Sequence, residues 1–423
     1  MFPYLCKSDA HLKMQLLTIV VNGNYNNRLM KYKLRDYQQE ASDKAVEFFL
    51  DESKQYNALE MLSCGAGKSL IIANIASRLE GKVIVFQPNV EILRQNYAKY
   101  CSYGLDDASI YSASMNTKEI GEKVTFATIG SVKNSTDLFK DYKYIIVDEA
   151  QFCNPAEGMY KRFFDSLQCK ILGLTATPYR LSSFKDYGSI LKFMTRSKPK
   201  IFTELLYYVQ TKDLVERGYL EKPQYYNVPP PLWNEGNLKL NSTCRDYTDE
   251  SVKAEYERSD LYKWLVNIVT RLMHPKDGSQ RSGILVFTRF VDEAKMLTYS
   301  IPGCAIVTGE TPKAERKQIL DDFRDGKIKV LANANCLSEG FDYPELDTVV
   351  MARPTRSLAK YTQVAGRCMR LRQDGKKKVP WFVDLCGNYK RFGKIEEQVL
   401  VDQNGKGKWV IMNGNKQLTN KFF

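Results

Sequence analysis

Residues 59–69 read Leu59-Glu60-Met61-Leu62-Ser63-Cys64-Gly65-Ala66-Gly67-Lys68-Ser69, an apolar run that leads into a stretch with helical spacing. The two glycines let backbone N–H groups curl around phosphate oxygens, and the start of a helix favours their negative charge. Lys68 is expected to reach the β- and γ-phosphates of a nucleotide, and Ser69 is expected to hold Mg²⁺. The stretch therefore predicts a phosphate-binding loop between a strand and a helix, although Leu62 stands where such loops usually have their first glycine.

A pair of acidic residues ends a second apolar run. Residues 144–147 are Tyr, Ile, Ile and Val, and Asp148 and Glu149 come directly after them. A strand that ends in this way places a carboxylate beside the metal of a bound nucleotide, so Asp148 is expected to share Mg²⁺ with Ser69. Glu149 is then expected to orient and deprotonate the attacking water. The alternative is a solvated acidic turn, and the phosphate loop earlier in the chain argues against it.

Strand-like and helix-like stretches alternate in two parts of the chain. Near-continuous apolar runs are typical of parallel strands buried on both faces, and their alternation with helices predicts parallel α/β sheets. Prolines at 223 and 229–231 mark an extended crossing between the parts, so the boundary is placed near residue 220. The expected lobes are residues 1–220, with an N-terminal extension up to Lys33, and residues 221–423, with a basic C-terminal tail.

The apolar runs and the helical spacings give bounds for individual elements. The expected strands are 83–86, 124–127, 144–147, 170–174, 284–287, 305–307, 329–332, 348–351 and 380–384. The expected helices are 69–79, 89–100, 203–218 and 312–323. No structure is predicted for residues 404–423, which are polar and basic.

A third group of polar residues lies in the second part of the chain. Gln363, Gly366, Arg367 and Arg370 form the pattern Gln-x-x-Gly-Arg-x-x-Arg. Because the arginines are three residues apart, they are expected on one face of a helix. Two guanidinium groups that face a γ-phosphate act as arginine fingers, which contribute about 10³–10⁵ in rate. Gln363 is assigned to the same catalytic group, and the alternative is a pair of surface arginines that bind acids or phosphate.

Taken in order, these motifs resemble those of the superfamily 2 helicases over residues 34–388. The resemblance implies an α/β fold with two tandem RecA-like lobes and an ATP cleft between them, with ATP and Mg²⁺ as cofactors. It implies that Arg35 and Gln38 contact the nucleotide, with Gln38 at the adenine edge, and that Gly340 and Asp342 face it from the second lobe. Strand-end loops are implied to line a groove for one nucleic-acid strand. The residues assigned to that groove are Gln87, Pro88, Asn89, Arg94, Thr128, Gly130, Thr288, Arg289, Thr308 and Gly309.

The finer resemblance is to RadD-like DNA repair helicases, in residues 34–41, 213–220, 308–316 and 383–388. Those relatives carry a cysteine-rich zinc module after the motor. This chain has ten cysteines, two histidines and no Cys-x-x-Cys pair, so no zinc module of the usual spacing is expected and the chain resembles a motor core alone. Compact chains of this kind are typical of phage-encoded relatives. Asn333-Ala334-Asn335 departs from the threonine-rich turn that family members often show.

The composition agrees with a nucleic-acid partner. The 423 residues suggest two or three domains at roughly 150 residues each. With 62 Lys and Arg against 49 Asp and Glu, the net charge is +13, which favours a polyanionic partner. No run of about 18 apolar residues exists, so no membrane-spanning helix and no membrane partner are expected. The cysteine pattern and the lack of a secretory signal predict a cytoplasmic protein, of a bacterial cell or of a phage-infected host.

Three functions are compatible with these features. The first is an ATP-dependent DNA helicase or translocase that moves on single-stranded DNA and remodels forked or branched DNA in replication, recombination or repair. Its expected partners are DNA and the proteins that bind single strands or act in replication and recombination. The second is an RNA helicase, although Gln151 and Thr175-Ala176-Thr177 differ from the DEAD-box motifs and favour DNA. The third is a nucleic-acid clamp that uses nucleotide only as a switch, which the intact Glu149, Arg367 and Arg370 argue against.

Overall fold

The computed structural model describes residues 32–421, except residues 122, 168, 185–187, 277, 279, 280, 282, 335, 338–340 and 342. The chain divides into two compact units. Of the described residues, the first unit holds 32–57, 67–148 and 159–173, and the second holds 58–66, 149–158 and 174–421. The phosphate loop therefore contributes to both units. Residues 1–31 of the expected N-terminal extension lie outside the described residues.

The first unit is built on strands whose side chains are largely buried. Its strands are β2 (Lys82–Gln87), β3 (Ala108–Ser112), β4 (Thr117–Lys118), β5 (Val124–Thr128), β6 (Tyr142–Asp148) and most of β7 (Lys170–Thr175). Its helices are α2 (Asp36–Leu50), α3 (Lys68–Arg78), α4 (Val90–Ser102), α5 (Ile129–Val132) and α6 (Met159–Ser166). Strand β2 runs parallel to both β5 and β6, as expected for an apolar run buried on both faces.

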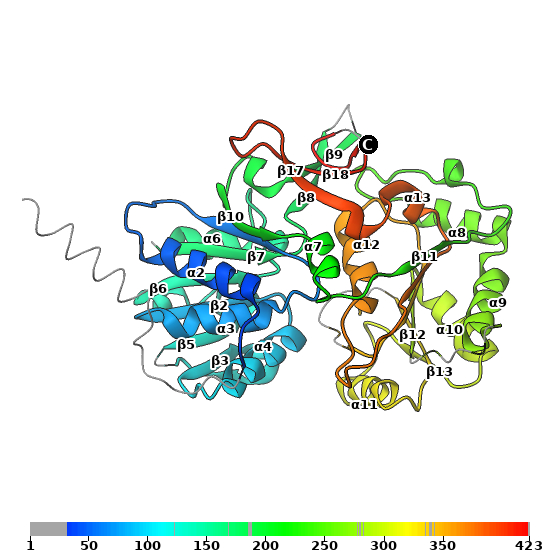
Figure 1. Ribbon diagram of the computed structural model, residues 1–423, viewed down its shortest axis with the longest axis horizontal. Helices are drawn as coiled ribbons and strands as arrows, with labels where there is room; N and C mark the ends of the chain where they lie inside the picture. Colours follow the sequence, from blue (N-terminus) through cyan, green and yellow to red (C-terminus); the bar gives the residue numbers. More distant parts are fainter. Residues whose placement is uncertain are drawn as a thin grey trace, which may run out of the picture. The chain divides into compact units, whose positions relative to one another are not determined.

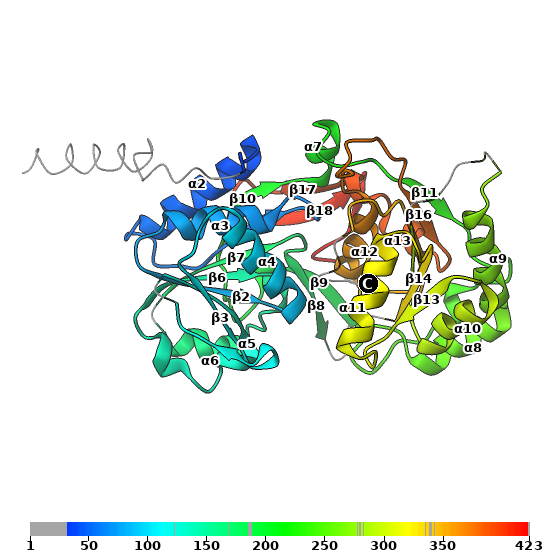
Figure 2. The same cartoon turned by 90° about the horizontal axis from the view of Figure 1, so that it is seen from below.

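Helices cover both faces of these strands. Figure 1 shows α2, α3 and α4 next to one another, and α3 contacts both of the others. In Figure 2 these three helices lie on one face of the strands and α5 and α6 lie on the opposite face. The strands and helices that the sequence predicts for this part of the chain are confirmed.

Lys170, at the start of β7, holds the end of α2. Its ammonium group donates hydrogen bonds to the carbonyl oxygens of Phe48 at 3.0 Å and Phe49 at 3.3 Å, and a third to that of Asp51. The last carbonyls of a helix have no partner within the helix, and a cation there also interacts favourably with the helix dipole. Burial lowers the pKa of the Lys170 ammonium group. Lys170 therefore ends α2 and fixes it against β7.

Lys170→Met is expected to lower the free energy of unfolding by about 1.5–3 kcal/mol, the range for hydrogen bonds to a charged group. The methionine keeps the apolar stem, while the carbonyl oxygens of Phe48 and Phe49 lose the Lys170 donor and that of Asp51 keeps the Lys54 N–H at 3.1 Å. Denaturant unfolding followed by circular dichroism measures the change. Lys161→Met is the control, because Lys161 forms an exposed pair with Asp165 at 2.5 Å and such pairs contribute little. An equal loss of stability in both variants would contradict the role of Lys170.

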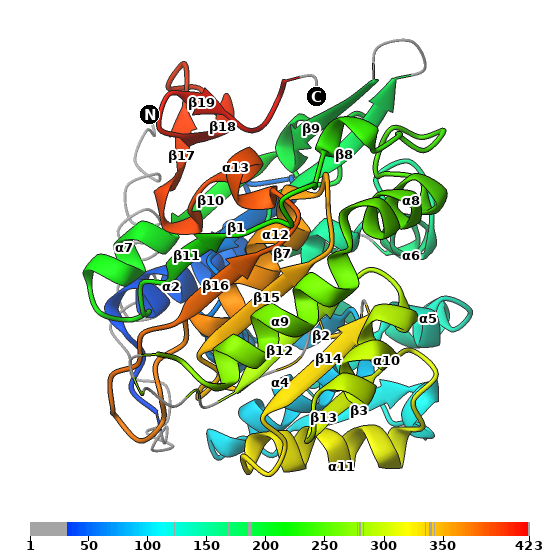
Figure 3. The same cartoon turned by 90° about the vertical axis from the view of Figure 1, so that its right-hand side faces the viewer.

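The second unit contains a six-stranded sheet whose recorded strand pairs are all parallel. In sheet order the strands are β11 (Gln224–Asn227), β16 (Trp381–Asp384), β15 (Thr348–Ala352), β12 (Ile284–Thr288), β14 (Val330–Ala334) and β13 (Cys304–Val307). Figure 3 shows this succession. The longer helices of the unit are α8 (Asp249–Ser259), α9 (Leu261–Met273), α10 (Val291–Ser300), α11 (Lys313–Arg324) and α12 (Leu358–Ala365).

A buried apolar cluster joins one face of this sheet to α8, α9 and α10. It includes Tyr256 of α8, Leu265 of α9 and Leu297 of α10, packed with Val286 of β12 and Val350 of β15. Because the strands are parallel, their carboxyl ends meet at a single edge. The expected α/β class with parallel sheets is confirmed in this part of the chain as well.

The remaining strands and α-helices also belong to the second unit. The further strands are β1 (Ala58–Leu62), β8 (Tyr179–Phe184), β9 (Gly188–Phe193), β10 (Glu204–Val209), β17 (Gln398–Asp402), β18 (Trp409–Asn413) and β19 (Lys416–Gln417), and the further helices are α7 (Thr211–Glu216) and α13 (Asn388–Phe392). The complete order of the larger sheet is β10-β1-β7-β6-β2-β5-β3-β4, with β10 parallel to β1. Strands β8 and β9 form an antiparallel pair, and β17, β18 and β19 form a small antiparallel sheet.

Two expectations from the sequence differ from the structure. The helix expected over residues 203–218 is wrong in its first half, because residues 204–209 form β10 and only 211–216 are helical. Burial alternates along the end of β10, since Tyr207 is buried and Tyr208 exposed, as in an edge strand with one covered face. The C-terminal stretch, for which no structure is predicted, contains β18 and β19.

Candidate functional site

The second glycine of the phosphate loop lies against helix α2 in the first unit. Gly67 has a φ of 80°, and a Cβ added there would come within 2.5 Å of Gln38 Nε2, so this position requires glycine. Gln38 is buried, and its Oε1 accepts a hydrogen bond from the Arg35 N–H at 2.9 Å. Helix α3 begins at Lys68, directly after the glycine. The structure thus brings together residues that the sequence assigns to the nucleotide.

A buried asparagine joins the serine of the loop to the first acid of the acidic pair. Asn96, on α4, donates hydrogen bonds to Asp148 Oδ2 and to Gln87 Oε1, each at 2.9 Å. Its Oδ1 accepts a hydrogen bond from the Ser69 hydroxyl. Hydroxyl and carboxylate oxygens are the ligands that Mg²⁺ prefers, and here both converge on one small side chain. Ser69 and Asp148 therefore fit the Mg²⁺ site that the sequence predicts.

Asn96 is a site residue that the sequence analysis misses. It is 2% exposed, and a polar side chain buried on a helix needs partners inside the protein. The signal in the sequence that could have identified Asn96 is its spacing. It lies on the same side of the helix as Ile92, Leu93 and Tyr100, which are buried. Gln87, which the sequence assigns to the nucleic-acid groove, is fully buried and bound to Asn96. We therefore reassign Gln87 to this internal network.

The second acid of the pair has an unusual backbone conformation. Glu149 directly follows β6 with a φ of 53°, and a non-glycine residue in that region is often kept for function. Its Oε2 accepts a hydrogen bond from Gln151 Nε2 at 2.7 Å, and Gln151 Oε1 accepts one from the Thr175 hydroxyl at 2.5 Å. The Thr175 hydroxyl in turn accepts the Thr177 N–H at 2.9 Å. This chain of bonds fixes the direction of the Glu149 carboxylate, as a general base requires.

Within the second unit, the first glycine of the loop lies beside the last arginine of the predicted pattern. Gly65 has a φ of 83°, and a Cβ added there would lie 2.9 Å from Leu220 Cδ2 and 3.4 Å from Arg370 Cγ. Arg370 forms an isolated β-bridge with Leu220, and burial lowers the pKa of its guanidinium group. A half-buried arginine that borders a phosphate loop has the surroundings an arginine finger needs.

The two predicted arginines do not share one face of a helix. Helix α12 ends before them, and η6 (Gly366–Cys368) is a 3₁₀ turn, so the helical spacing stops ahead of Arg370. Arg367 Nη1 donates a hydrogen bond to the Phe341 carbonyl oxygen at 2.6 Å. Gln363 is buried on α12. The expected shared face is therefore wrong, and the catalytic roles of these residues stay predictions.

Two residues assigned to the nucleic-acid groove are engaged inside the second unit. Thr288 is fully buried, and its hydroxyl donates to backbone carbonyl oxygens at 2.9 and 3.2 Å. Arg289 forms ion pairs with Asp246 at 3.3 Å and with Asp249 at 2.8 Å. Side chains held in this way have little to offer a nucleic-acid strand. We therefore reassign both residues to the packing of this unit.

The other residues assigned to nucleotide or nucleic acid stay predictions. Asn89 is the N-cap of α4, and its Oδ1 accepts the Ile92 N–H at 2.9 Å. Gly340 and Asp342 lie outside the described residues. Of the rest, Arg94, Gly130 and Gly309 are exposed, and Pro88, Thr128 and Thr308 are half-buried.

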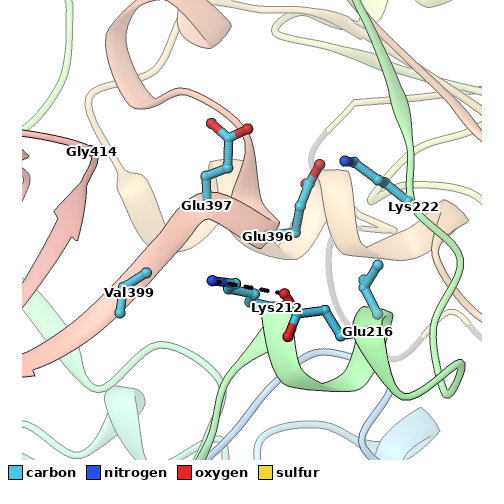
Figure 4. Close-up of a pocket in the computed structure, with 8 residues that line it drawn as sticks. Lys212, Glu216, Lys222, Glu396, Glu397, Val399 and Gly414 are labelled. Carbon is cyan, nitrogen blue, oxygen red and sulfur yellow. Dashed lines mark ion pairs between the residues drawn. The ribbon is translucent and has the colours of Figure 1, made fainter.

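A separate cavity of about 390 Å³ lies in the second unit. Figure 4 shows its lining residues, most of which come from α7, from η7 (Ile395–Glu397) and from β17, while Lys222 and Gly414 lie outside these elements. Lys212 and Glu216 form an ion pair there at 3.8 Å, and Glu396 Oε2 accepts a hydrogen bond from the Tyr225 hydroxyl at 2.7 Å. None of the predicted site residues is among those that line this cavity.

The described residues contain neither a cluster of metal-ligating side chains nor a helix that could span a membrane. In that part of the chain, no group of three or more His, Cys, Asp or Glu side chains could hold a metal ion. No helix in the same ranges is both long enough and apolar enough to cross a membrane.

Two family models match the chain. The model described as Type III restriction enzyme, res subunit, matches residues 31–180, and the one described as Helicase conserved C-terminal domain matches residues 262–372. The first match includes the phosphate loop and the acidic pair, and the second includes Arg367 and Arg370. The predicted motifs thus fall within the matched regions in the expected order.

Curated relatives cover most of the chain at low identity. A 51.5 kDa protein of Lactococcus phage (isolate 7-9) is 26% identical over 317 residues, which cover 72% of this chain and 61% of the relative. The DNA 3'-5' translocase XPB2 of Sulfurisphaera tokodaii is 24% identical, and the match covers 80% of this chain and 79% of the relative. The chain spans between 51% and 61% of the length of the first three curated relatives.

Solved structures share the fold. The ATP-dependent Type ISP restriction-modification enzyme LlaBIII, bound to DNA, is 20% identical with a TM-score of 0.62 over 85% of this chain and 28% of its own. Dbp5 of S. cerevisiae, bound to RNA and ADP BeF3, is 18% identical with a TM-score of 0.57 over 85% of this chain and 88% of its own. This likeness confirms the predicted α/β class with two tandem RecA-like lobes.

Proposed function

Since the chain belongs to the superfamily 2 helicases, we propose that it is an ATP-driven motor that moves along single-stranded DNA and remodels forked or branched DNA in replication, recombination or repair. Both matched regions of such a motor are present in one chain. The placement among RadD-like helicases, the lobe boundary near residue 220, the cytoplasmic location and the protein partners stay predictions.

The chain of hydrogen bonds from Thr175 through Gln151 to Glu149 is the observation that carries the proposal. It holds one carboxylate in a fixed direction, which a base that takes a proton from the attacking water requires. A clamp that only binds nucleotide has no need of this arrangement. Thr175 is the last residue of β7, shortly before β8 begins. The same hydrogen bonds therefore join the acidic pair to the end of β7.

The residues around the phosphate loop have complementary roles in ATP hydrolysis. Lys68 and the N–H groups of the loop bind the phosphates, and Glu149 takes the proton of the attacking water. Arg370 lies beside Gly65 and is suited to compensate the negative charge that develops on the γ-phosphate. When bound at Ser69 and Asp148, Mg²⁺ supplies a positive charge to the phosphate oxygens.

The DNA part of the proposal rests on charge and on relatives. A net charge of +13 favours a polyanion, and binding through phosphate contacts is expected to weaken steeply with salt. The relative XPB2 is named a DNA translocase, and the structure of LlaBIII was solved with DNA. RNA is the second candidate, because Dbp5, which shares the fold, was solved with RNA.

The test is the rate of ATP hydrolysis without polymer and with single-stranded DNA, forked DNA or single-stranded RNA. Strong stimulation by DNA is the expected result, and strand displacement on a labelled fork then distinguishes unwinding from translocation. Stimulation by RNA alone would replace DNA by RNA as the substrate. Tight, salt-sensitive DNA binding without hydrolysis under any condition would remove the motor and favour the clamp.

A further inference from the structure

Two buried arginines lie in the loop that leads from β15 into α12. Arg353 is 4% exposed and Arg356 is 9% exposed. No hydrogen bond or ion pair joins either guanidinium group to any residue that the structure describes, and the Nε atom of each is buried without an acceptor. Arginine stays charged inside proteins, so burial without a counter-ion is costly. Two such residues in one loop indicate a ligand that brings negative charge.

The acids near this loop already have partners. Asp246 interacts electrostatically with both arginines, but it forms its ion pair with Arg289 at 3.3 Å. Glu235 is paired with Arg391 at 3.0 Å. Burial lowers the pKa of both loop arginines, as expected where desolvation outweighs the nearby negative charge. Glu293 is buried and also interacts electrostatically with Arg353, while its Oε2 accepts the backbone N–H of Arg289 at 3.0 Å. None of these three acids forms an ion pair with either loop arginine, so among the described residues the two guanidinium groups lack a directly bound counter-ion.

The loop that carries the arginines is rigidly held. Asn388 Oδ1 accepts the Thr355 N–H at 2.9 Å, and Asn388 Nδ2 donates to the Arg353 carbonyl oxygen at 2.9 Å. The Tyr256 hydroxyl donates to the carbonyl oxygen of Ala352 at 3.1 Å. Both Asn388 and Tyr256 are buried, so these bonds are shielded from water. The backbone is thus fixed before any ligand arrives, which favours a binding site over a loop that adapts.

The position of the loop favours an extended ligand. Strand β15 ends at Ala352, so the loop lies at the carboxyl edge of the parallel six-stranded sheet. Thr308 and Gly309, which the sequence assigns to the nucleic-acid groove, follow the carboxyl end of β13 at the same edge. Ligands of open parallel sheets bind at this edge. A polymer can contact several strand ends at once, whereas one free phosphate cannot.

We propose that Arg353 and Arg356 together bind one backbone phosphate of the DNA strand. The inference rests on the proposed motor function and adds to it the residues that grip the strand in the second unit. Arginine suits this role because its planar group donates two parallel hydrogen bonds to phosphate oxygens. In this proposal, Arg353 and Arg356 make the nucleic-acid contact that the sequence analysis assigns to Arg289.

The test compares binding of a fluorescent single-stranded oligonucleotide to the wild type and to the variant Arg353→Gln/Arg356→Gln, without nucleotide, at several salt concentrations. The variant is expected to bind about 10- to 100-fold more weakly, as for the loss of charged hydrogen bonds. The slope of log K against log salt should fall by about 0.7, the value for one phosphate of a single strand. Its melting temperature should not fall, because it loses unpaired charges rather than ion pairs.

Two control variants separate this effect from general changes. Arg162→Gln/Arg271→Gln removes the same charge from two exposed helix positions and should keep the wild-type salt slope. Arg289→Gln breaks two ion pairs and should lower the melting temperature. If the Gln double variant fails to fold, Arg353→Lys/Arg356→Lys replaces it, with weaker binding and an unchanged salt slope expected because the charges remain.

Several results would overturn the proposal. Wild-type affinity and slope in the Gln variant, or wild-type affinity in the Lys variant, would remove the phosphate contact. Weaker binding of ATP to the Gln variant in a separate titration would assign the phosphate to the nucleotide instead of the strand. If DNA stimulates ATP hydrolysis by the wild type and these variants still bind DNA normally, the proposed motor function stands and only the arginine–phosphate contact is refuted. If the wild type binds no polynucleotide, both the motor function and the arginine–phosphate contact are refuted.

Discussion

Glu149→Gln is expected to lower the turnover number for ATP hydrolysis by about 10²–10⁴-fold while ATP still binds. Glutamine has the same shape and retains an acceptor oxygen for Gln151 Nε2, which lies 2.7 Å from Glu149 Oε2. It cannot take a proton from water, so the chemical step loses its base. Steady-state hydrolysis with single-stranded DNA measures the turnover number, and titration with a fluorescent ATP analogue measures affinity.

The matched control is Glu157→Gln, an exposed glutamate in the turn after the acidic pair. It should hydrolyse ATP at the wild-type rate. An unchanged turnover number in Glu149→Gln would exclude Glu149 as the base. Loss of ATP binding in that variant would instead assign Glu149 to nucleotide binding.

Arg370→Ala is expected to lower the turnover number by about 10³–10⁵-fold, the range for an arginine finger. The reason is its place beside Gly65 in the phosphate loop, where its charge can act on the transferred phosphoryl group. Arg370→Lys keeps a charge but not the planar fork, so it should recover only part of the rate. Hydrolysis at saturating ATP and DNA measures both variants.

Arg367→Ala is the comparison for this prediction. Arg367 Nη1 donates to the Phe341 carbonyl oxygen at 2.6 Å, so part of its role is to hold that segment. Its replacement should therefore cost less than that of Arg370. The reverse order, or a lower melting temperature in Arg370→Ala that explains its lost activity, would contradict the assignment.

The parallel core of both units could be predicted from the sequence because its strands are continuous apolar runs. Examples are residues 83–86 and 284–287, short apolar runs rich in Val and Ile that lie between helical patterns and therefore predict buried strands. Strand β10 was predicted as part of a helix, because its apolar residues also fit helical spacing and only its pairing with β1 decides the matter. Strands β18 and β19 were not predicted, since their register depends on β17 and not on local pattern.

Some residues of the candidate site could likewise be predicted from the sequence, and others could not. Glycines at 65 and 67 and the acids at 148 and 149 follow motif spacing, so the sequence identifies them. Asn96 and Gln151 could not be assigned roles from spacing, because their partners Asp148, Ser69 and Thr175 are brought to them only by the fold. The same holds for Arg353 and Arg356, because only the folded chain shows that no described residue accepts a hydrogen bond from their Nε atoms.

Strand β1 lies between β7 and β10 in the larger sheet, and all five of its residues are buried. A shortened protein that stops at residue 180, where the first family match ends, lacks β10 and leaves one edge of β1 open. An open apolar edge is a template for pairing between chains. Such a fragment should aggregate when it is produced alone, whereas one that continues through Val209 keeps the edge covered and is the better choice for studying the nucleotide loop in isolation.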